Sequence, residues 1–365
     1  MNKIYYCKIT ENSLSLGLCN QFFCLVTGII TAYKMGKKII IVDHFSNDYL
    51  QHIPISFSEV IDIKSLQQFL KKEYDLFLVE KNNLDFQVNT VVYGQDNQWI
   101  DITEKVILKY TLNDTLYINT QVDLNKLAER DPCPNRQKKI KISYSFHGNM
   151  IEEEFDEYGC VLKKNVLFDV SQTPFIHTFG WINKIDRIMF DKILHELYPA
   201  TSFIKEANIF CNEKQINPYS RINVLHLRLE KDAIMHWSHM NNMNPYLFQQ
   251  IISNKYIQLI KKYVDKSDHN IILSYSTNNV VCDFLKQNGY IYYFTNKSKD
   301  KGREMNAWID LNIGKLANHL FIGNFNLEKL TGSTLSYCLS NYYDKSVKKI
   351  MIDLDNITHN EQVVN

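Results

Sequence analysis

From residue 223 onward, the chain alternates between strand-forming and helix-forming segments with short connections. Short apolar runs predict strands, and longer amphipathic runs predict helices. The expected strands are 223–227, 270–274, 290–294, 320–322 and 349–352, and the expected helices are 245–264, 279–287, 304–317 and 334–343. Such alternation builds a parallel sheet that is covered by helices. This half of the chain is therefore predicted to be a Rossmann-like α/β domain.

The beginning of the chain shows the same pattern once. The expected elements are a strand at 3–9, a turn at 11–17, a buried helix at 20–35 and a strand at 38–42. Gly36 suits the end of this helix, and the whole segment is a βαβ unit. We therefore predict two Rossmann-like domains, 1–217 and 218–365, that face each other across a cleft. Ligands of α/β proteins bind at the carboxyl ends of the strands, and clefts between domains favour binding.

The middle of the chain has a different character. Lys138–Phe146 alternates polar and apolar residues, which is typical of an antiparallel strand. The range 106–121 has a similar pattern, with Asn113 and Asp114 as a turn. We therefore expect a β-rich insertion at about 85–169 in the N-terminal domain. The range 185–211 predicts one or two helices, interrupted at Pro199.

Composition excludes several classes of partner. The 365 residues are 45% hydrophobic, which is enough for a substantial core, and the net charge is only +1. A net charge this small does not indicate the basic surface that binds nucleic acid. The longest apolar tract, 22–32, is too short to span a bilayer, and the N-terminus lacks the pattern of a signal peptide. We expect no nucleic-acid partner, no membrane insertion and a cytoplasmic location. The eight cysteines form no CxxC pair and are expected to be buried thiols.

The segment Ile222–Asp232 contains the sharpest chemical pattern. His226, Arg228 and Glu230 alternate along the end of a predicted strand, so their side chains share one side. An arginine at the carboxyl end of a buried strand suits a phosphate, because its donors pair with anionic oxygens in a bidentate way. The alternative is a structural ion pair between Arg228 and Glu230.

Two further segments lie where a strand leads into a helix. Gly17 allows a close backbone approach at the first junction, and Asn20 either caps the helix or donates its amide to an oxyanion. At the second junction, Gly332, Ser333 and Thr334 offer backbone amides and hydroxyls that can surround an anion. In both places the alternative is an ordinary helix cap.

Three weaker patterns are also present. Thr277 follows the strand at 270–274, in a polar stretch that either binds a base or ribose or forms a turn. The Asp353-Leu354-Asp355 pattern matches that of Mg²⁺-dependent glycosyltransferases, but it follows the last predicted strand. Asp232, His236 and His239 have helical spacing but no fourth ligand. We therefore predict no metal site.

Four short segments together resemble a known superfamily. They are Gly17–Gln21 (Gly-x-x-Asn-Gln), His226–Asp232 (His-x-Arg), Phe321–Asn324 (Phe-Ile-Gly-Asn) and Gly332–Ser336 (similar to Ser-Ser-Phe-Ser). The sequence resembles the GDP-fucose-dependent fucosyltransferases of GT-B fold, especially the protein O-fucosyltransferase-like branch. The resemblance covers short blocks in the correct order. The spacing between Asn324 and Ser333 is wider than in the family, and the β-rich middle section matches nothing in it.

This resemblance implies a nucleotide sugar bound mainly by the C-terminal domain. Arg228 would hold the diphosphate, His226 would lie near the base or ribose, and Ser333 and Thr334 would contact phosphate. Asn20 would reach across the cleft. No metal or other cofactor is implied, because arginine and helix-end amides can stabilise the departing diphosphate.

The catalytic base is left open between Glu230, Asp232 and Asp43. We predict a metal-independent inverting glycosyltransferase that moves a deoxyhexose, fucose from GDP-fucose, to a hydroxyl of a glycan or protein. The alternatives are a rhamnosyltransferase that uses UDP-rhamnose and a catalytically inactive GT-B module that binds carbohydrate or nucleotide.

Overall fold

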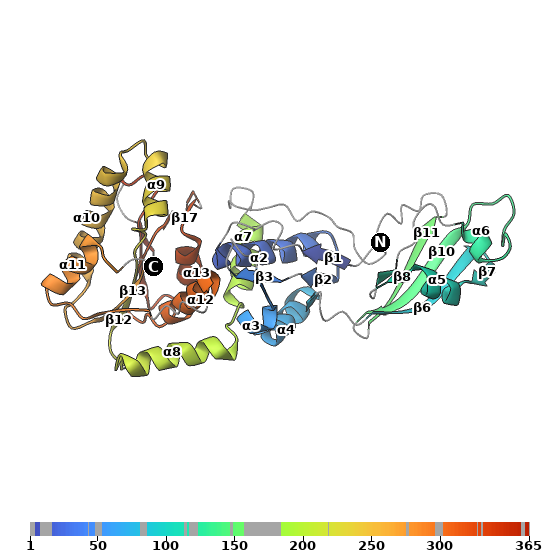
Figure 1. Cartoon of the computed structure of the whole chain (residues 1–365), viewed down its shortest axis with the longest axis horizontal. Helices are drawn as coiled ribbons and strands as arrows, with labels where there is room; N and C mark the ends of the chain where they lie inside the picture. The colour runs from blue at the N-terminus through green and yellow to red at the C-terminus, as the bar shows by residue number, and fades with distance from the viewer. Residues whose placement is uncertain are drawn as a thin grey trace. The chain divides into compact units, whose positions relative to one another are not determined.

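The computed structural model (Figure 1) describes most of the chain. The described residues are 4–7, 17–42, 44–47, 53–80, 86–112, 115–116, 123–146, 149–156, 184–217, 219–274, 277–295, 302–326, 328–329, 331–358 and 362–364. The chain forms two compact units. The first unit comprises Met1–Ile9, Gly28–His44 and Gln67–Thr173, and the second comprises Thr10–Thr27, Phe45–Leu66 and Pro174–Asn365. The predicted boundary after residue 217 and the GT-B arrangement stay predictions.

The first unit contains a three-stranded parallel sheet. Its strands are β1 (Ile4–Cys7), β2 (Ile39–Val42) and β5 (Phe77–Glu80), in that order. Helix α2 (Leu18–Lys34) connects β1 to β2, so the predicted βαβ unit is confirmed. Gly36 ends the helix with a φ of 66°, a left-handed conformation that glycine adopts without a steric penalty. The predicted turn at 11–17 lies outside the described residues, except for Gly17.

The first unit also contains a four-stranded antiparallel sheet. Its strands are β6 (Phe86–Gln95), β7 (Gln98–Asp101), β10 (Lys139–Phe146) and β11 (Asn149–Asp156), in the order β11-β10-β6-β7. Apolar side chains of one face are buried, among them Val91, Ile140 and Ile142. The alternation predicted in Lys138–Phe146 is confirmed, because it matches the period of a strand with one solvated face.

Part of the range predicted as strands is helical. Residues Thr103–Tyr110 form helix α5, which precedes β8 (Thr111–Leu112) and β9 (Thr115–Leu116). The strand prediction for 106–110 was therefore wrong, and Asn113 and Asp114 lie outside the described residues. The physical reason is a helix start: the carboxylate of Asp101 accepts a hydrogen bond from the backbone N–H of Thr103 at 2.8 Å. A short helix, α6 (Leu124–Leu127), follows.

The second unit contains several smaller elements. They are β3 (Phe45–Asn47), β4 (Ile53–Ile55), α3 (Phe57–Val60), α4 (Ile63–Tyr74), α7 (Lys184–His195) and α8 (Thr201–Glu213), although α4 continues into the first unit. The break between α7 and α8 contains Pro199, as predicted. The first part of α2 also belongs to this unit, where Phe22 packs edge-on against Trp308 at 4.8 Å. The indole N–H of Trp308 donates to the Val60 carbonyl at 2.6 Å.

The second unit is built on a six-stranded sheet. The strands are β12 (Ile222–His226), β13 (His269–Leu273), β14 (Tyr292–Phe294), β15 (Leu320–Gly323), β18 (Lys348–Met351) and β19 (Gln362–Val364). Their order is β14-β13-β12-β15-β18-β19, and the first five are parallel. The predicted α/β class with parallel sheets is confirmed. The strand at 349–352 is not the last one, because β19 adds an antiparallel edge.

Helices cover both faces of this sheet. Figure 1 shows α9 (Lys231–Met240), α10 (Pro245–Tyr263) and α11 (Val280–Gln287) on one side, and α12 (Gly302–Gly314) and α13 (Thr334–Tyr342) on the other. From β12, strands β13 and β14 extend the sheet in one direction, whereas β15 and β18 extend it in the other. The winding therefore reverses between β12 and β15. Ligands of doubly wound sheets bind at the carboxyl ends of the strands at such a reversal. Within the described residues, none of the helices combines the length and apolarity that a bilayer span needs.

A polar network lies at the opposite end of this sheet, where the strands β12 and β15 begin. The guanidinium of Arg221 donates to His319 Nε2 at 2.7 Å, and His319 Nδ1 lies 2.9 Å from Asn223 Oδ1. Because the arginine can only donate, His319 accepts at Nε2 and donates at Nδ1, which is a neutral imidazole. Arg221 also pairs with Asp265 at 2.7 Å and with Asp268 at 3.4 Å.

We expect this network to weaken in acid. Burial, followed by the charge of Arg221, lowers the pKa of His319 below its usual 6.5, although Asp268 and Asp265 act in the opposite direction. A lowered folded-state pKa contributes stability above pH 6.5 that is lost as the pH falls through the folded-state value. Urea unfolding at pH 7.5 and 5.5 should therefore show a larger loss of unfolding free energy for the native chain than for His319→Gln. Equal losses would contradict the assignment of a neutral histidine.

Candidate active site

Some of the predicted site residues of the second unit, His226 among them, lie where the sheet reverses its winding. His226 is the last residue of β12, and Asn324 directly follows β15, the neighbouring strand. Both side chains are buried. The carboxyl ends of these two strands therefore place polar side chains at the position that α/β folds use for ligands.

Ser336 of α13 connects these two strand ends. Its hydroxyl oxygen lies 2.7 Å from His226 Nδ1 and accepts the backbone N–H of Asn324 at 2.9 Å. This close contact depends on Gly323, because a Cβ there would lie 3.0 Å from the Ser336 hydroxyl and 2.7 Å from the Phe321 ring. The helix is thereby fixed against the ends of β12 and β15.

Tyr256 of α10 completes the network from the other face of the sheet. Its hydroxyl accepts the backbone N–H of Arg228 at 3.1 Å and donates to Asn324 Oδ1 at 2.5 Å. The amide of Asn324 in turn donates to the His226 carbonyl at 2.6 Å. Burial raises the pKa of Tyr256 above its usual value, so the hydroxyl keeps its proton. The backbone that carries His226 and Arg228 is therefore held by buried hydrogen bonds.

Arg228 is the cation of this site. Its side chain is 30% exposed, and Nη1 lies 3.6 Å from a carboxylate oxygen of Glu230, so the predicted alternative of an ion pair is also present. That distance is longer than a hydrogen bond. The Nε atom is buried and has no hydrogen-bond partner within the described residues. Buried donors are normally paired, so a guanidinium donor left unengaged by the described residues is unusual at this strand end.

Helix α13 begins beside the hydrogen-bond network that holds the backbone of Arg228. Ser333 occupies the N-cap position, its side chain makes no capping hydrogen bond, and its backbone N–H donates to the Asn324 carbonyl at 2.7 Å. Ser333 therefore supplies no side-chain acceptor to the N-terminal amides of α13, unlike most N-cap residues. The N-terminal amides and the positive end of the helix dipole favour an anion here. Thr334 is the first helical residue.

Gly332, which precedes Ser333, has a steric reason to be glycine. Its φ is 126°, and a Cβ would lie 2.6 Å from the Asn324 carbonyl oxygen. We expect Gly332→Ala to lower the unfolding free energy by about 1–3 kcal/mol, the usual range for such backbone strain. Gly17→Ala is the matched control, because a Cβ at Gly17 meets no atom within 4 Å. Similar urea midpoints for the two variants would contradict the strain at Gly332.

The N-terminal segment lies beside α13 within the second unit. Phe23 of α2 packs edge-on against Tyr337 of α13, with ring centroids 5.7 Å apart. The backbone N–H of Asn20 donates to the Gly17 carbonyl at 2.9 Å, so Gly17 precedes the helix and Asn20 lies in its first turn. The capping role weighed for Asn20 was therefore wrong. Its reach toward an oxyanion stays a prediction.

The remaining described candidates lie at or just before the starts of helices. Glu230 is the N-cap residue of α9 without a side-chain capping bond, and Asp232 lies exposed in the first turn of that helix. Thr277 is exposed ahead of Asn279, whose side chain caps α11. Asp43 lies outside the described residues. The roles proposed for these side chains stay predictions.

The candidate metal ligands have other contacts. Asp353 accepts the side-chain amide of Asn326 at 2.6 Å and the backbone N–H of Asp355 at 2.9 Å, and Asp355 accepts the hydroxyl of Thr331. This pattern of acceptor bonds shapes a turn after β18. Across the described part of the chain, no group of three or more His, Cys, Asp or Glu side chains could hold a metal ion.

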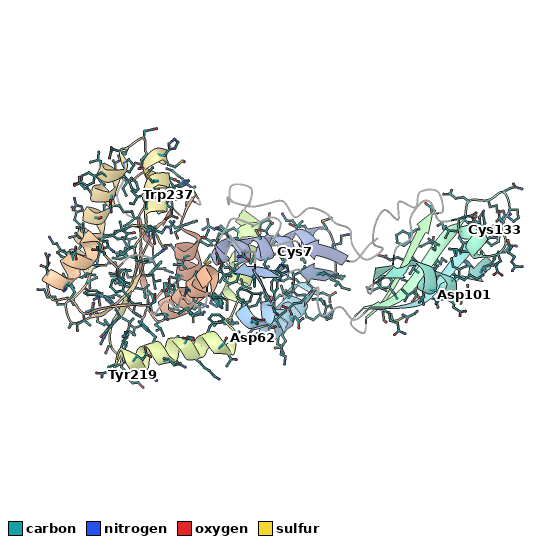
Figure 2. The ribbon with its side chains drawn as sticks, viewed as in Figure 1. Cys7, Asp62, Asp101, Cys133, Tyr219 and Trp237 are labelled. Atoms are coloured by element: carbon teal, nitrogen blue, oxygen red, sulfur yellow. The ribbon has the colours of Figure 1, made fainter. Side chains whose placement is uncertain are left out.

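Helix α9 carries the histidines whose helical spacing resembles that of metal ligands. His236 and His239 are exposed on it, and His236 packs edge-on against Trp237 at 4.7 Å. Figure 2 shows Trp237 on this helix. The contact agrees with the packing interpretation.

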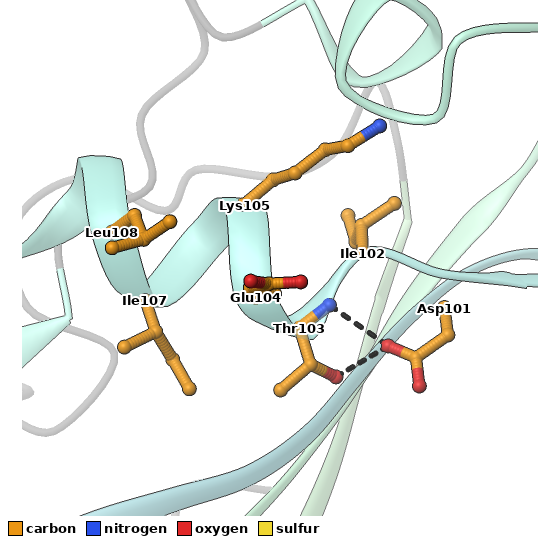
Figure 3. A pocket seen from close by; sticks show the side chains of 7 residues that line it. All are labelled: Asp101, Ile102, Thr103, Glu104, Lys105, Ile107 and Leu108. Carbon is orange, nitrogen blue, oxygen red and sulfur yellow. Dashed lines mark hydrogen bonds between the residues drawn. The ribbon is translucent and has the colours of Figure 1, made fainter.

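A shallow hollow lies elsewhere, over helix α5 of the first unit (Figure 3). Its volume is about 470 Å³, and it is lined by Asp101, Ile102, Thr103, Glu104, Lys105, Ile107 and Leu108. The carboxylate of Asp101 accepts both the N–H and the hydroxyl of Thr103, and these hydrogen bonds lower its pKa. The hollow contains none of the predicted site residues, and its carboxylate is engaged in starting the helix.

Three residues of the network had no role in the sequence prediction. Asn324 and Ser336 lay in recognised motifs, but only the sheet order shows that they meet at His226. Tyr256 was missed altogether. A signal was present, because Phe248, Ile252 and Tyr256 recur every four residues on the buried face of α10. A tyrosine on such a face needs a partner for its hydroxyl.

Comparison with known proteins finds likeness in structure alone. No protein-family model and no curated protein matches the sequence. A structure of POFUT1 in complex with GDP-fucose is similar, with a TM-score of 0.47, 11% identity and 94% of each chain covered. The fucosyltransferase NodZ from Bradyrhizobium is similar with a TM-score of 0.47, 10% identity and coverage of 100% of this chain and 99% of NodZ.

The chain is thus similar in structure to these fucosyltransferases.

Proposed function

We propose that the chain is a glycosyltransferase that uses a nucleotide-sugar donor, with GDP-fucose as the donor and a glycan or protein hydroxyl as the acceptor. The main support is Arg228 at the point where the sheet reverses its winding, with a buried Nε that no described residue engages. A guanidinium in this position suits the diphosphate of a nucleotide. The choice of fucose rests on the His226–Asp232 motif and its resemblance.

The proposed reaction is a metal-independent inverting displacement. The bond between the anomeric carbon and the diphosphate oxygen breaks, and the acceptor oxygen bonds to the same carbon from the opposite side. Arg228 and the amides at the start of α13 would stabilise the charge on the departing diphosphate. The acceptor's proton would pass to a carboxylate, for which Glu230 and Asp232 are the described candidates.

A nucleotide titration tests the donor. We expect GDP and GDP-fucose, but not UDP, to raise the unfolding free energy, by about 2.7 kcal/mol at a hundred times the Kd. The measurement is thermal unfolding with each nucleotide in EDTA, followed by an assay of GDP-fucose hydrolysis. Stabilisation by UDP alone would favour the rhamnosyltransferase alternative. Binding without hydrolysis or transfer would favour the inactive module, and no shift with any nucleotide would contradict the proposal.

A further inference from the structure

A β-hairpin precedes helix α13 at the candidate site. Its strands β16 (Phe325–Asn326) and β17 (Thr331–Gly332) are antiparallel and connect the end of β15 to the start of α13. The backbone N–H of Ser333 donates to the carbonyl of Asn324 at 2.7 Å and closes the hairpin at its base. This hairpin occupies the wide spacing between Asn324 and Ser333. The position of the first amides of α13 therefore depends on how the hairpin is held.

Two carboxylates hold the hairpin, one on each strand. Asn326 of β16 and Thr331 of β17 lie directly opposite each other. The side-chain amide of Asn326 donates to Asp353 at 2.6 Å, and the hydroxyl of Thr331 donates to Asp355. Hydrogen bonds to an ionised acceptor are about twice as strong as those between neutral groups. The cross-strand pair is therefore fastened on both strands.

The turn that carries these carboxylates is fixed to the sheet. It follows β18, and the backbone N–H of Ile352 donates to the carbonyl of Gly323 at 2.9 Å, at the end of β15. Asp353 is buried, and its other carboxylate oxygen accepts the backbone N–H of Asp355 at 2.9 Å. Since Gly323 directly precedes Asn324, one strand end holds both the turn and the base of the hairpin.

We propose that Asp353 and Asp355 are positioning residues, which clamp the hairpin and thereby hold the first amides of α13 in place for the diphosphate of the donor. This inference rests on the proposed function for its ligand, whereas the clamp is a property of the chain alone. Gly332 transmits the constraint, because its backbone lies so close to Asn324 that a Cβ there would be 2.6 Å from the carbonyl oxygen. The two aspartates act through hydrogen bonds to side chains of the hairpin.

The clamp is tested first without a ligand. Thr331→Val removes the hydroxyl and keeps the size and branching of the side chain. We expect the backbone N–H of Ser333 to exchange with deuterium about 10-fold faster in this variant, the effect of one lost hydrogen bond. Thr358→Val is the matched control, because the Thr358 hydroxyl donates to Asn356 at 2.9 Å in an exposed turn. Native exchange at Ser333 in Thr331→Val, measured by NMR, would overturn the inference.

The second test asks whether a hydrogen bond or a charge is needed at Asp355. Asp355→Asn keeps an oxygen that can accept the Thr331 hydroxyl, whereas Asp355→Ala removes the acceptor. We expect Asp355→Asn to bind GDP as tightly as the native chain in calorimetry, and Asp355→Ala to bind it about 5- to 30-fold more weakly, within the usual range for coupling between sites. Thr331→Val should lose as much as Asp355→Ala, and the double variant no more, because both substitutions remove the same bond.

Three outcomes of these measurements would contradict the clamp. If Asp355→Asn lost as much GDP affinity as Asp355→Ala, the charge would matter in place of the hydrogen bond. If the losses of Thr331→Val and Asp355→Ala added up in the double variant, the two residues would act separately. If both variants lost stability but kept native GDP affinity, Asp355 would support the fold alone. If the native chain bound no GDP, the proposed function would fail, while hydrogen exchange would still decide whether the clamp holds α13.

Discussion

Arg228→Ala should lower kcat/KM for transfer or donor hydrolysis by about 100- to 1,000-fold, the effect of removing one donor to a developing negative charge. The guanidinium lies at the carboxyl end of β12, and its buried Nε is not engaged by a described residue. GDP affinity should fall as well, because the same group would contact the diphosphate of the product. Steady-state kinetics with GDP-fucose and calorimetry with GDP measure the two effects.

Arg228→Lys separates charge from geometry. Lysine keeps the positive charge but lacks the planar fork of donors that pairs with phosphate oxygens. We therefore expect activity between those of the native chain and Arg228→Ala. Arg136→Ala is the neutral control, because Arg136 is exposed and its guanidinium pairs, within the described part of the chain, with Asp96 alone at 3.4 Å. Surface ion pairs of this kind contribute about 0–1 kcal/mol.

Glu230→Gln tests the ion-pair alternative directly. If Arg228 served mainly to pair with Glu230, this substitution would damage the site as much as Arg228→Ala does. If Arg228 binds the diphosphate, GDP affinity should be kept or should rise, since the guanidinium loses its competing carboxylate at 3.6 Å. Loss of transfer with intact GDP binding would identify Glu230 as the base, and Asp232→Asn offers the same comparison for the second candidate.

Much of the second unit was predictable because each helix and strand carries its own signal within one short segment of the sequence. The apolar runs that became β12, β13 and β15 are bounded by polar residues, and the helices between them begin with capping residues such as Asn244 and Asn279. The strand β19 was missed, because a three-residue strand that pairs with β18 has no local signal. Helix α5 was mistaken for a strand, because its Val106, Ile107 and Leu108 read equally well as a strand in so short a run.

The site was predictable only in part, and for a different reason. The motif at His226 and Arg228 contains side chains whose chemistry is evident from sequence, and the pairing of phosphate with arginine needs no structure. Their supports come from α10, β15 and α13, which are far apart in the chain. Which of many buried polar residues meet at one strand end depends on the sheet order, and that order is a tertiary property.

Tyr256→Phe tests whether these supports matter for function. The substitution removes one oxygen and leaves the ring in place, so the Arg228 N–H and Asn324 Oδ1 lose their partner. We expect the unfolding free energy to fall by about 1–3 kcal/mol, the penalty for buried groups left unpaired. GDP affinity should fall too, because the backbone of Arg228 is no longer held.

The matched control for this experiment is Tyr246→Phe in the first turn of the same helix. Tyr246 is 69% exposed, so its substitution should change stability by no more than about 0.5 kcal/mol. Urea unfolding and GDP calorimetry on both variants separate two cases. If Tyr256→Phe lost stability but kept native GDP affinity, the hydroxyl would support the fold without positioning Arg228. If it matched Tyr246→Phe in both measurements, the buried network would not hold the strand end at all.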